Sequence, residues 1–404
     1  MSARPPVPGA PRHDPGSGAL PEPDAVGRAH SERLAALVRE RLSDAPLPFV
    51  DYMTLALHEP GLGYYMAGAP KFGAEGDFVT APELSPLFGR CLAQSCAQVL
   101  ETLAEPGILE LGAGSGRLAA SLLGALPEPV PYTILEPSAE LRERQRSLLA
   151  ASLAPETFAN VRWIETLPER VGGVVLANEV MDALPVERFV RLDGRTWQVC
   201  VGVDEAGEGF VDVLRDAPDE LASAVVDIET DLGRALPDDY AAELCPSLGP
   251  WVASLAERLE AGVLLLADYG YPRRELYHEE RRGGTLACYY RHRAHGDPYL
   301  WPGLQDITAH VDFTRAAEAA TRAGLDLLGY AAQSAVLLDC GLVELAEAER
   351  ARLEREPERI ALARAVRTLT LPGEMGERFQ FIAFGRGYDR ALRGFGLQDL
   401  THRL

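Results

Sequence analysis

The chain has 404 residues and a formal net charge of −21 at pH 7. This length is enough for one large domain or two smaller ones with a substantial core. The acidic excess argues against nucleic acid as the main partner, because binding to phosphates requires clustered Lys and Arg. It is compatible with a cationic ligand or an arginine-rich protein substrate, and equally with simple solubility.

The cysteines and the apolar runs exclude further classes. The six cysteines form no C-x-x-C pair, so we expect buried reduced thiols in a cytoplasmic protein, and no metal site. No apolar run approaches the ~20 residues that a membrane helix needs. The N-terminus lacks the charged-then-apolar order of a signal peptide.

The N-terminal part of the chain is predicted to form a tail, then helices and a long loop. Residues 1–28 are rich in Pro, Gly, Ala and Ser and lack large apolar side chains, so we expect a disordered tail. Residues 29–105 are assigned to a helical and loop region. Apolar spacing predicts helices at residues 31–45, 50–57 and 85–103. The glycine-rich stretch 61–82 has the length of a functional or disordered loop.

The segment Ile108–Arg117 is predicted to be a short apolar strand, a glycine-rich turn and the start of a helix. Glycines let the backbone approach a ligand closely and leave N–H groups pointing at it. A dinucleotide fingerprint needs a third glycine at position 117, where this chain has arginine, so an NAD-dependent oxidoreductase is disfavoured. The spacing G-x-G-x-G after an acid instead favours S-adenosylmethionine, although a turn without a ligand is an alternative. The residues expected to line this site are Glu110, Gly112, Gly114 and Gly116.

Two further groups of polar residues follow predicted strands. The run 131–135 ends in Glu136, at the place where an adenosine cofactor's ribose hydroxyls are held, about 20 residues past the loop. Alternatively, Glu136 caps the helix predicted to follow it. Asn178, Glu179 and Asp182 come directly after a buried strand, and such positions meet the ligand crevice of an open α/β sheet.

The remaining chain completes an α/β pattern. An Asp-Gly turn at 193–194 between two alternating runs predicts a hairpin within a β-rich insertion at about 186–245. Helices are predicted at 218–236, 247–260, 313–323 and 340–369, and an irregular tract at 271–312. Seven core strands are predicted near residues 108, 132, 161, 174, 263, 326 and 380. The first five alternate with helices, which indicates a parallel sheet with helices on both faces.

These elements predict a Rossmann-like α/β fold, which resembles that of class I methyltransferases. Its seven-stranded, mostly parallel sheet occupies residues 106–386 and carries the β-rich insertion between strands four and five. The last two strands are expected to pair antiparallel, and residues 387–404 form a C-terminal tail.

Several separated motifs resemble the MidA-type S-adenosylmethionine-dependent methyltransferases, over residues 46–386. The motifs are E-P-x-x-G-Y-Y at 59–65, F-G-x-x-G-D-F-x-T-x-P-E at 72–83, E-L-G-x-G-x-G at 110–116, N-E-x-x-D-A-x-P-V at 178–186, D-Y-G at 268–270, D-I-T-x-H-V-D-F at 306–313 and M-G-E-x-F at 375–379. The mitochondrial members are respiratory complex I assembly factors that look like protein arginine methyltransferases. The resemblance therefore implies methylation of arginine in a protein substrate.

The resemblance also implies roles for particular residues. Asp77, Thr80 and Pro82 close over the cofactor, beside the glycines, Glu136 and Asn178. Asn178 and Glu179 fall where methyltransferase loops meet the reactive methyl. Because carboxylates bind a planar guanidinium well, we expect Glu179 to orient the acceptor nitrogen. Asp182 supports the loop, or caps the chain before Pro185.

Other interpretations stay open. Tyr64, Tyr65 and Phe78 either wall the methyl pocket or anchor the loop. Asp306, His310 and Asp312 suit a proton relay, although Asp312 also fits a helix N-cap. The alternatives to a protein methyltransferase are a non-catalytic assembly factor for a respiratory or other complex that binds the cofactor, and a small-molecule methyltransferase. The sequence leaves open whether the chain forms a homodimer, and a bacterial member is expected in the cytoplasm.

Overall fold

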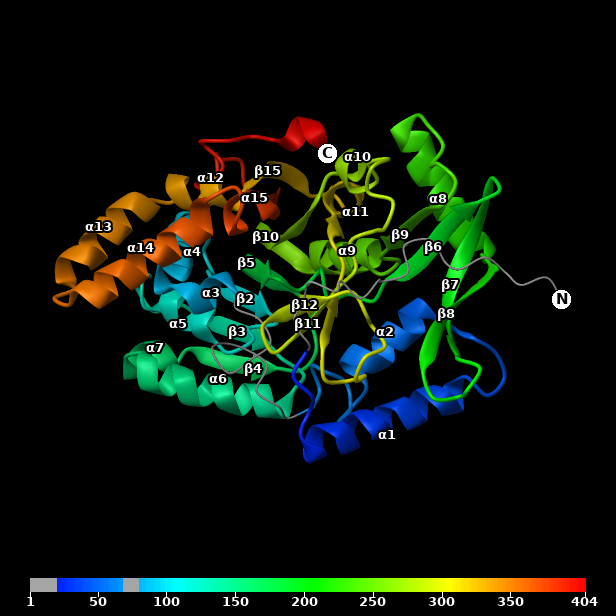
Figure 1. Cartoon of the computed structure of the whole chain (residues 1–404). Helices are drawn as coiled ribbons and strands as arrows, with labels where there is room; N and C mark the ends of the chain where they lie inside the picture. Colours follow the sequence, from blue (N-terminus) through cyan, green and yellow to red (C-terminus); the bar gives the residue numbers. More distant parts are fainter. Residues whose placement is uncertain (1–19, 68–79) are drawn as a thin grey trace. The chain divides into compact units, whose positions relative to one another are not determined.

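The computed structural model describes residues 20–67 and 80–404, and the chain forms two compact units (Figure 1). Of the described residues, the parallel-sheet unit comprises 80–181, 249–270 and 313–404. The antiparallel-sheet unit comprises 20–67, 182–248 and 271–312.

Within the described residues, the main sheet has eight strands, of which seven lie in the order β15-β16-β10-β5-β2-β3-β4, and β14 (Val311–Asp312) pairs with β10 off this path. The bounds of the seven are Ile108–Leu111 (β2), Tyr132–Leu135 (β3), Val161–Ile164 (β4), Val171–Asn178 (β5), Leu259–Tyr271 (β10), Asp326–Ala332 (β15) and Phe379–Arg386 (β16). The pairs from β4 to β10 are parallel, whereas β16 is antiparallel to both of its neighbours. The mostly parallel sheet and its antiparallel last pair are confirmed.

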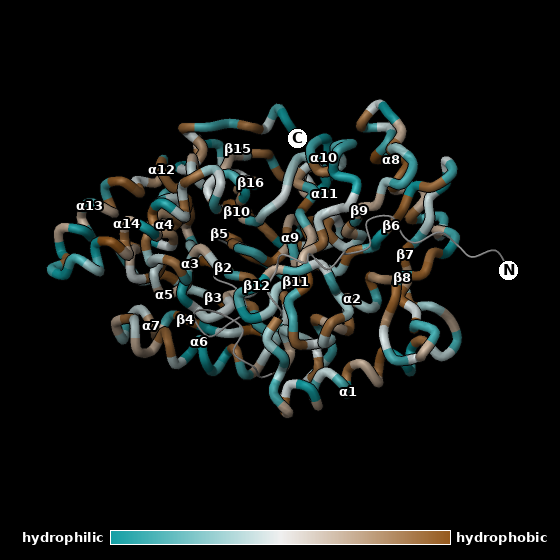
Figure 2. Tube along the Cα trace, in the orientation of Figure 1, coloured by the Kyte–Doolittle hydropathy of each residue, from teal (hydrophilic) through white to brown (hydrophobic). Residues whose placement is uncertain are grey.

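Helices pack on this sheet because its central strands are mostly apolar. β5 and β10 are buried over most of their length, and Figure 2 shows long hydrophobic stretches in both; a strand covered on both faces requires this. The helices are Ala81–Leu84 (α3), Pro86–Leu100 (α4), Arg117–Leu123 (α5), Ala139–Ser152 (α6), Pro155–Phe158 (α7), Leu248–Arg258 (α9), Phe313–Arg322 (α11), Gln333–Asp339 (α12), Leu342–Arg352 (α13), Glu356–Thr370 (α14), Met375–Arg378 (α15) and the 3-10 turn Thr401–Arg403 (η1).

The strand order indicates where in this sheet a ligand crevice is expected. β3 and then β4 lie on one side of β2, whereas β5 and then β10, which come later in the chain, lie on its other side. Ligands bind outside the carboxyl ends of the strands where the order reverses in this way. These ends are Leu111 of β2 and Asn178 of β5.

The antiparallel-sheet unit contains two small sheets. β8 pairs with β7 beside the path β1-β7-β6-β9, and a separate sheet has the order β12-β11-β13. The hairpin predicted at Asp193-Gly194 is confirmed, with Leu192 opposite Arg195. The elements are Ala25–Arg41 (α1), Leu47–Pro48 (β1), Phe49–His58 (α2), Glu187–Leu192 (β6), Arg195–Val203 (β7), Phe210–Asp216 (β8), Asp219–Leu232 (α8), Tyr240–Leu244 (β9), Arg273–Leu276 (α10), Ala287–Tyr290 (β11), Arg293–His295 (β12), Asp306–Thr308 (β13) and Val311–Asp312 (β14).

Some predicted boundaries were wrong, for local reasons. α1 begins at Ala25 instead of residue 31, because the Asp24 side chain accepts a hydrogen bond from the N–H of Gly27. α8 ends at Leu232, short of the predicted residue 236, because Gly233 takes the left-handed conformation, and β9 lies between the two predicted helices, where no element was predicted. Most of the expected tail, residues 1–19, lies outside the described residues.

Two other regions were also mispredicted. The tract 271–312 contains strands β11 to β14, which its short apolar runs did not reveal. The single helical segment 340–369 is divided between α13 and α14, which pack side by side (Figure 1).

The C-terminal segment 387–404 is bonded to the parallel-sheet unit. The N–H groups of Gly394 and Gly396 donate to the Asp339 carboxylate, and the N–H of Leu400 donates to the Tyr330 carbonyl. Within residues 20–67 and 80–404, no helix is long and apolar enough to cross a membrane.

We predict that Gly173→Ala destabilises the parallel-sheet unit. Gly173 has φ +120°, and a Cβ there would lie 1.8 Å from the Gly107 carbonyl oxygen. That carbonyl accepts the N–H of Val174, so the backbone cannot move aside without losing a strand contact. Urea unfolding should show a loss of at least about 2 kcal/mol. Gly373→Ala, where a Cβ meets nothing within 4 Å, is the control and should stay near wild type.

Candidate functional site

The turn after β2 is built from glycines in the left-handed region. Gly112, Gly114 and Gly116 have φ of 63°, 55° and 88°. A Cβ at Gly112 would come within 3.0 Å of Val180 Cγ2. The turn thus brings bare backbone to the carboxyl end of β2, at the crevice, and this arrangement suits close approach of a ligand.

Glu83 fastens this turn from the neighbouring helix α3. Its carboxylate accepts a hydrogen bond from the Ser115 hydroxyl and forms an ion pair with Arg117 Nε at 2.6 Å. The Glu83 side chain is 7% exposed and the Arg117 side chain 55%. Arg117, at the position of the missing third glycine, therefore ties the loop to the segment that contains Thr80 and Pro82. In the sequence, Glu83 appeared only as the last residue of the motif at 72–83, and no role was assigned to it.

Glu136 follows β3 and is buried. Its Oε1 accepts the N–H of Ser138 at 2.9 Å, but the residue that caps α6 is Ser138 itself, whose hydroxyl accepts the N–H of Leu141. Its Oε2 accepts from the Gln145 amide at 3.2 Å. A carboxylate oxygen can accept more than one hydrogen bond.

Glu110 is buried within β2 and bonded inside the sheet. The Tyr132 hydroxyl donates to its Oε2 at 2.8 Å. Burial raises the pKa of the Glu110 carboxyl to about 7, against the opposing effect of the Tyr132 hydrogen bond and with a smaller contribution from the charge of Glu136. Its predicted contact with the cofactor stays a prediction.

Glu179 has a backbone conformation that non-glycine residues rarely adopt, with φ +54°. Its N–H donates to the Ala267 carbonyl at 2.8 Å. Its Oε1 accepts from Asn178 Nδ2 at 3.1 Å and from the N–H of Ala81 at 3.4 Å. The end of β5 is thus connected to α3, the same short helix that fastens the glycine turn.

Asp268 stabilises the turn after Glu179, and the sequence analysis gave it no role. Its side chain is fully buried at 0% exposure. Oδ2 accepts the N–H groups of Val180 and Met181 at 3.1 and 2.8 Å, and Oδ1 accepts that of Tyr269. The sequence feature that could have identified Asp268 was its position directly after a predicted buried strand, as the first residue of the D-Y-G motif.

In the antiparallel-sheet unit, Asp182 and Asp306 are buried near Tyr65. The Tyr65 hydroxyl donates to Asp306 Oδ1 at 2.7 Å, and its ring stacks on His58. Burial, followed by the charges of Asp306 and Asp182, raises the pKa of Tyr65. The Asp182 carbonyl accepts the N–H of Ala309, which fixes the start of the loop. Tyr65 therefore has the anchoring contact that one interpretation expected.

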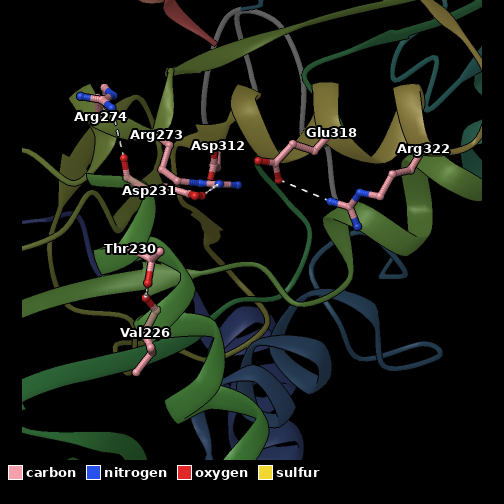
Figure 3. Close-up of polar contacts among 8 residues, drawn as sticks. All are labelled: Val226, Thr230, Asp231, Arg273, Arg274, Asp312, Glu318 and Arg322. Atoms are coloured by element: carbon pink, nitrogen blue, oxygen red, sulfur yellow. Dashed lines mark hydrogen bonds and ion pairs between the residues drawn. The ribbon is translucent and has the colours of Figure 1, made fainter. Parts of the chain in front are cut away.

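Asp312 belongs to an ion-pair network in the same unit (Figure 3). Its Oδ2 lies 3.1 Å from Arg273 Nε, and Arg273 also pairs with Asp231. The carboxylate of Asp312 therefore neutralises a buried guanidinium. This contact gives the proposed relay through Asp312 no support.

The predicted site residues are divided between the two units. Those in the parallel-sheet unit are Thr80, Pro82, Glu110, Gly112, Gly114, Gly116, Glu136, Asn178 and Glu179, whereas Asp182 begins a segment of the other unit. Asp77 and Phe78 lie outside the described residues. Within 20–67 and 80–404, no three His, Cys, Asp or Glu side chains are grouped as a metal site requires.

The fold and the glycine turn define a class I S-adenosylmethionine-dependent methyltransferase. Residues 91–331 match the model of a family described as "Putative S-adenosyl-L-methionine-dependent methyltransferase". A crystal structure from Burkholderia thailandensis with bound S-adenosyl-homocysteine is similar with a TM-score of 0.89 and 43% identity, covering 96% of this chain and 100% of that one. The chain belongs to this family, the MidA-type methyltransferases, and its cofactor is S-adenosyl-L-methionine.

Two curated relatives are mitochondrial proteins. The Drosophila melanogaster "Protein arginine methyltransferase NDUFAF7 homolog" is 31% identical, over 91% of this chain and 88% of its own length. The Homo sapiens "Protein arginine methyltransferase NDUFAF7" is 26% identical, over 84% and 80%.

We predict that Glu83→Ala weakens binding of S-adenosylhomocysteine by roughly 3- to 10-fold, because Ser115 and Arg117 lose a shared partner. Titration calorimetry measures the affinity. Glu349→Ala removes the ion pair with Arg90 on α4 and should leave the affinity unchanged. Equal affinities for Glu83→Ala and wild type would contradict this role.

We further predict that Glu110 makes folding stability fall with rising pH. The folded chain binds this proton more tightly than the unfolded chain, because the pKa is raised from 4.5 to about 7. The associated stability is complete below pH 4.5 and is lost as the pH rises to about 7, amounting to roughly 3 kcal/mol. Glu110→Gln should flatten the urea-unfolding profile over this range, whereas the exposed Glu354→Gln should not.

Proposed function

We propose that this methyltransferase transfers the methyl group to an arginine of a protein substrate. The proposal depends chiefly on Glu179, a carboxylate held in an unfavourable backbone conformation at the carboxyl end of β5. Strain of this kind persists where the surrounding structure enforces it, and it is concentrated at functional sites. The names of the mitochondrial relatives support the same acceptor.

The chemistry of an arginine acceptor suits a fixed carboxylate. A guanidinium is planar and always charged, so a carboxylate can orient its plane and balance its charge through charge-assisted hydrogen bonds. We assign this contact to Glu179, with Asn178 beside it. Asp268 fixes the turn behind them through two backbone N–H groups.

The cofactor residues are proposed on the same basis. The glycine turn and Asn178 hold the cofactor, Glu136 accepts its ribose hydroxyls, and the segment Thr80–Pro82 closes beside the turn. When bound, the cofactor supplies an electrophilic methyl group on a sulfonium. The protein's contribution is then mainly to align the acceptor nitrogen with that methyl, because orientation removes much of the barrier. Asp182 supports the acceptor loop through its carbonyl contact with Ala309.

We predict that Glu179→Gln lowers methyl transfer by about 100-fold or more while cofactor binding stays within about threefold of wild type. Glutamine keeps the size and an acceptor oxygen for Ala81 but loses the charge that a guanidinium needs. Lysate proteins from the native host, incubated with the chain and methyl-labelled cofactor, are digested and searched for methylarginine by mass spectrometry. The exposed Glu105→Gln is the control.

The outcomes separate the competing functions. Methylarginine that disappears with Glu179→Gln supports the proposal. Label in a small molecule, or on another residue type, contradicts the arginine acceptor. Tight cofactor binding with no transfer to any acceptor would favour a non-catalytic assembly factor.

A further inference from the structure

Gln145 lies in α6, outside every motif of the sequence, and its side chain is fully buried at 0% exposure. Nε2 donates to the Gly114 carbonyl at 2.9 Å and to Glu136 Oε2 at 3.2 Å. Oε1 accepts from Trp163 Nε1 at 2.9 Å. A buried amide is unfavourable unless it is hydrogen-bonded, and both ends of this amide are bonded.

Trp163 determines which way the Gln145 amide faces. The indole N–H can only donate, so the atom opposite it must be the amide oxygen. The amide NH2 group then faces two acceptors, the Gly114 carbonyl and the Glu136 carboxylate. The reverse orientation would set an oxygen against these acceptors and an NH2 group against the indole N–H.

Trp163 is itself fixed by neighbours on two helices. The Arg146 guanidinium carbon lies 4.5 Å from its ring centroid, and the Phe158 ring centroid lies 6.4 Å away. Trp163 belongs to β4, whereas the glycine turn follows β2 and Glu136 follows β3. One amide therefore connects the ends of two strands to a third strand.

Glu136 and the glycine turn both depend on this amide for orientation. Ser138 N–H holds one oxygen of Glu136, and Gln145 holds the other, so rotation of the carboxylate is restricted. The same amide fixes the Gly114 carbonyl and hence the plane of the peptide after it. The backbone N–H groups of the turn take their direction from that plane.

We propose that Gln145 is a positioning residue for the cofactor's ribose, and that Trp163 acts on cofactor binding through Gln145. The Trp163 indole N–H orients the Gln145 amide, which in turn orients the Glu136 carboxylate toward the ribose hydroxyls. The proposal concerns the cofactor only, so it is independent of which acceptor receives the methyl group.

The test compares S-adenosylhomocysteine with its 2′,3′-dideoxy analogue, which lacks the ribose hydroxyls, by titration calorimetry on the full chain. Trp163→Phe removes one N–H and keeps most of the ring. This substitution should lower the affinity for S-adenosylhomocysteine by about tenfold, as expected for a disturbed hydrogen bond to a charged group. The affinity for the analogue should fall by less than about twofold.

Two further variants test the direction of the effect. Gln145→Glu places an oxygen against Glu136 and the Gly114 carbonyl. It should therefore lower the affinity for S-adenosylhomocysteine more than Trp163→Phe does. In a Glu136→Gln background, Trp163→Phe should lower the affinity for S-adenosylhomocysteine by less than about threefold, because the carboxylate that the Gln145 amide orients is then absent. Since Gln145→Glu is a severe change in a buried position, Trp163→Phe decides the proposal if that variant does not fold.

Matched controls exist elsewhere in the chain. Trp197→Phe removes an indole N–H that donates to the Leu192 carbonyl in β6. Gln333→Glu alters another buried amide, which donates to the Leu369 carbonyl. Both should leave the two affinities unchanged.

Three results would overturn the proposal. Equal losses for the two compounds would show that Gln145 only supports the fold of the site. Unchanged affinities would show that the amide does not orient Glu136. A folded wild-type chain that binds neither compound would refute the cofactor site itself.

Discussion

The site depends on backbone that carries no Cβ at the carboxyl end of β2. The sheet order brings this end next to the end of β5, so the glycine turn and Asn178-Glu179 lie at the same edge of the sheet. The neighbours pack directly on that bare backbone, with Val180 close to Gly112 and Gln145 bonded to Gly114. Val180 can pack this closely only because Gly112 carries no Cβ.

Buried carboxylates make the second part of the site rigid. Asp268 accepts three backbone N–H groups at 0% exposure, and Glu83 binds Ser115 and Arg117. Charge-assisted hydrogen bonds of this kind are stronger than neutral ones in a buried environment. The Asp268 contacts hold the turn that follows Glu179, and the Glu83 contacts hold the glycine turn, so both turns are positioned by folding before a ligand binds.

Much of this arrangement could be predicted from local patterns. The strands β2, β3, β5 and β10 are apolar runs, and the glycines, Glu136, Asn178 and Glu179 follow strand ends directly. A residue that follows a strand in the sequence also follows it in space, so spacing alone located these groups.

The groups that were missed act across long sequence separations. Gln145 is bonded to Gly114 and Trp163, and Asp268 to Val180, through contacts that only the folded sheet creates. Nothing in the pattern of α6 distinguishes Gln145 from any other polar helix residue. The strands β9 and β11 to β13 were missed for a similar reason, because short strands are stabilised by their partners more than by their own residues.

The most direct test of the central claim is titration calorimetry of the full chain with S-adenosylhomocysteine, combined with Gly112→Val. The wild type should bind the compound saturably, with one site per chain. The variant should remain folded by circular dichroism and lose binding, because a branched side chain would occupy the space beside Val180. Full binding by the folded variant, or none by the wild type, would contradict the account.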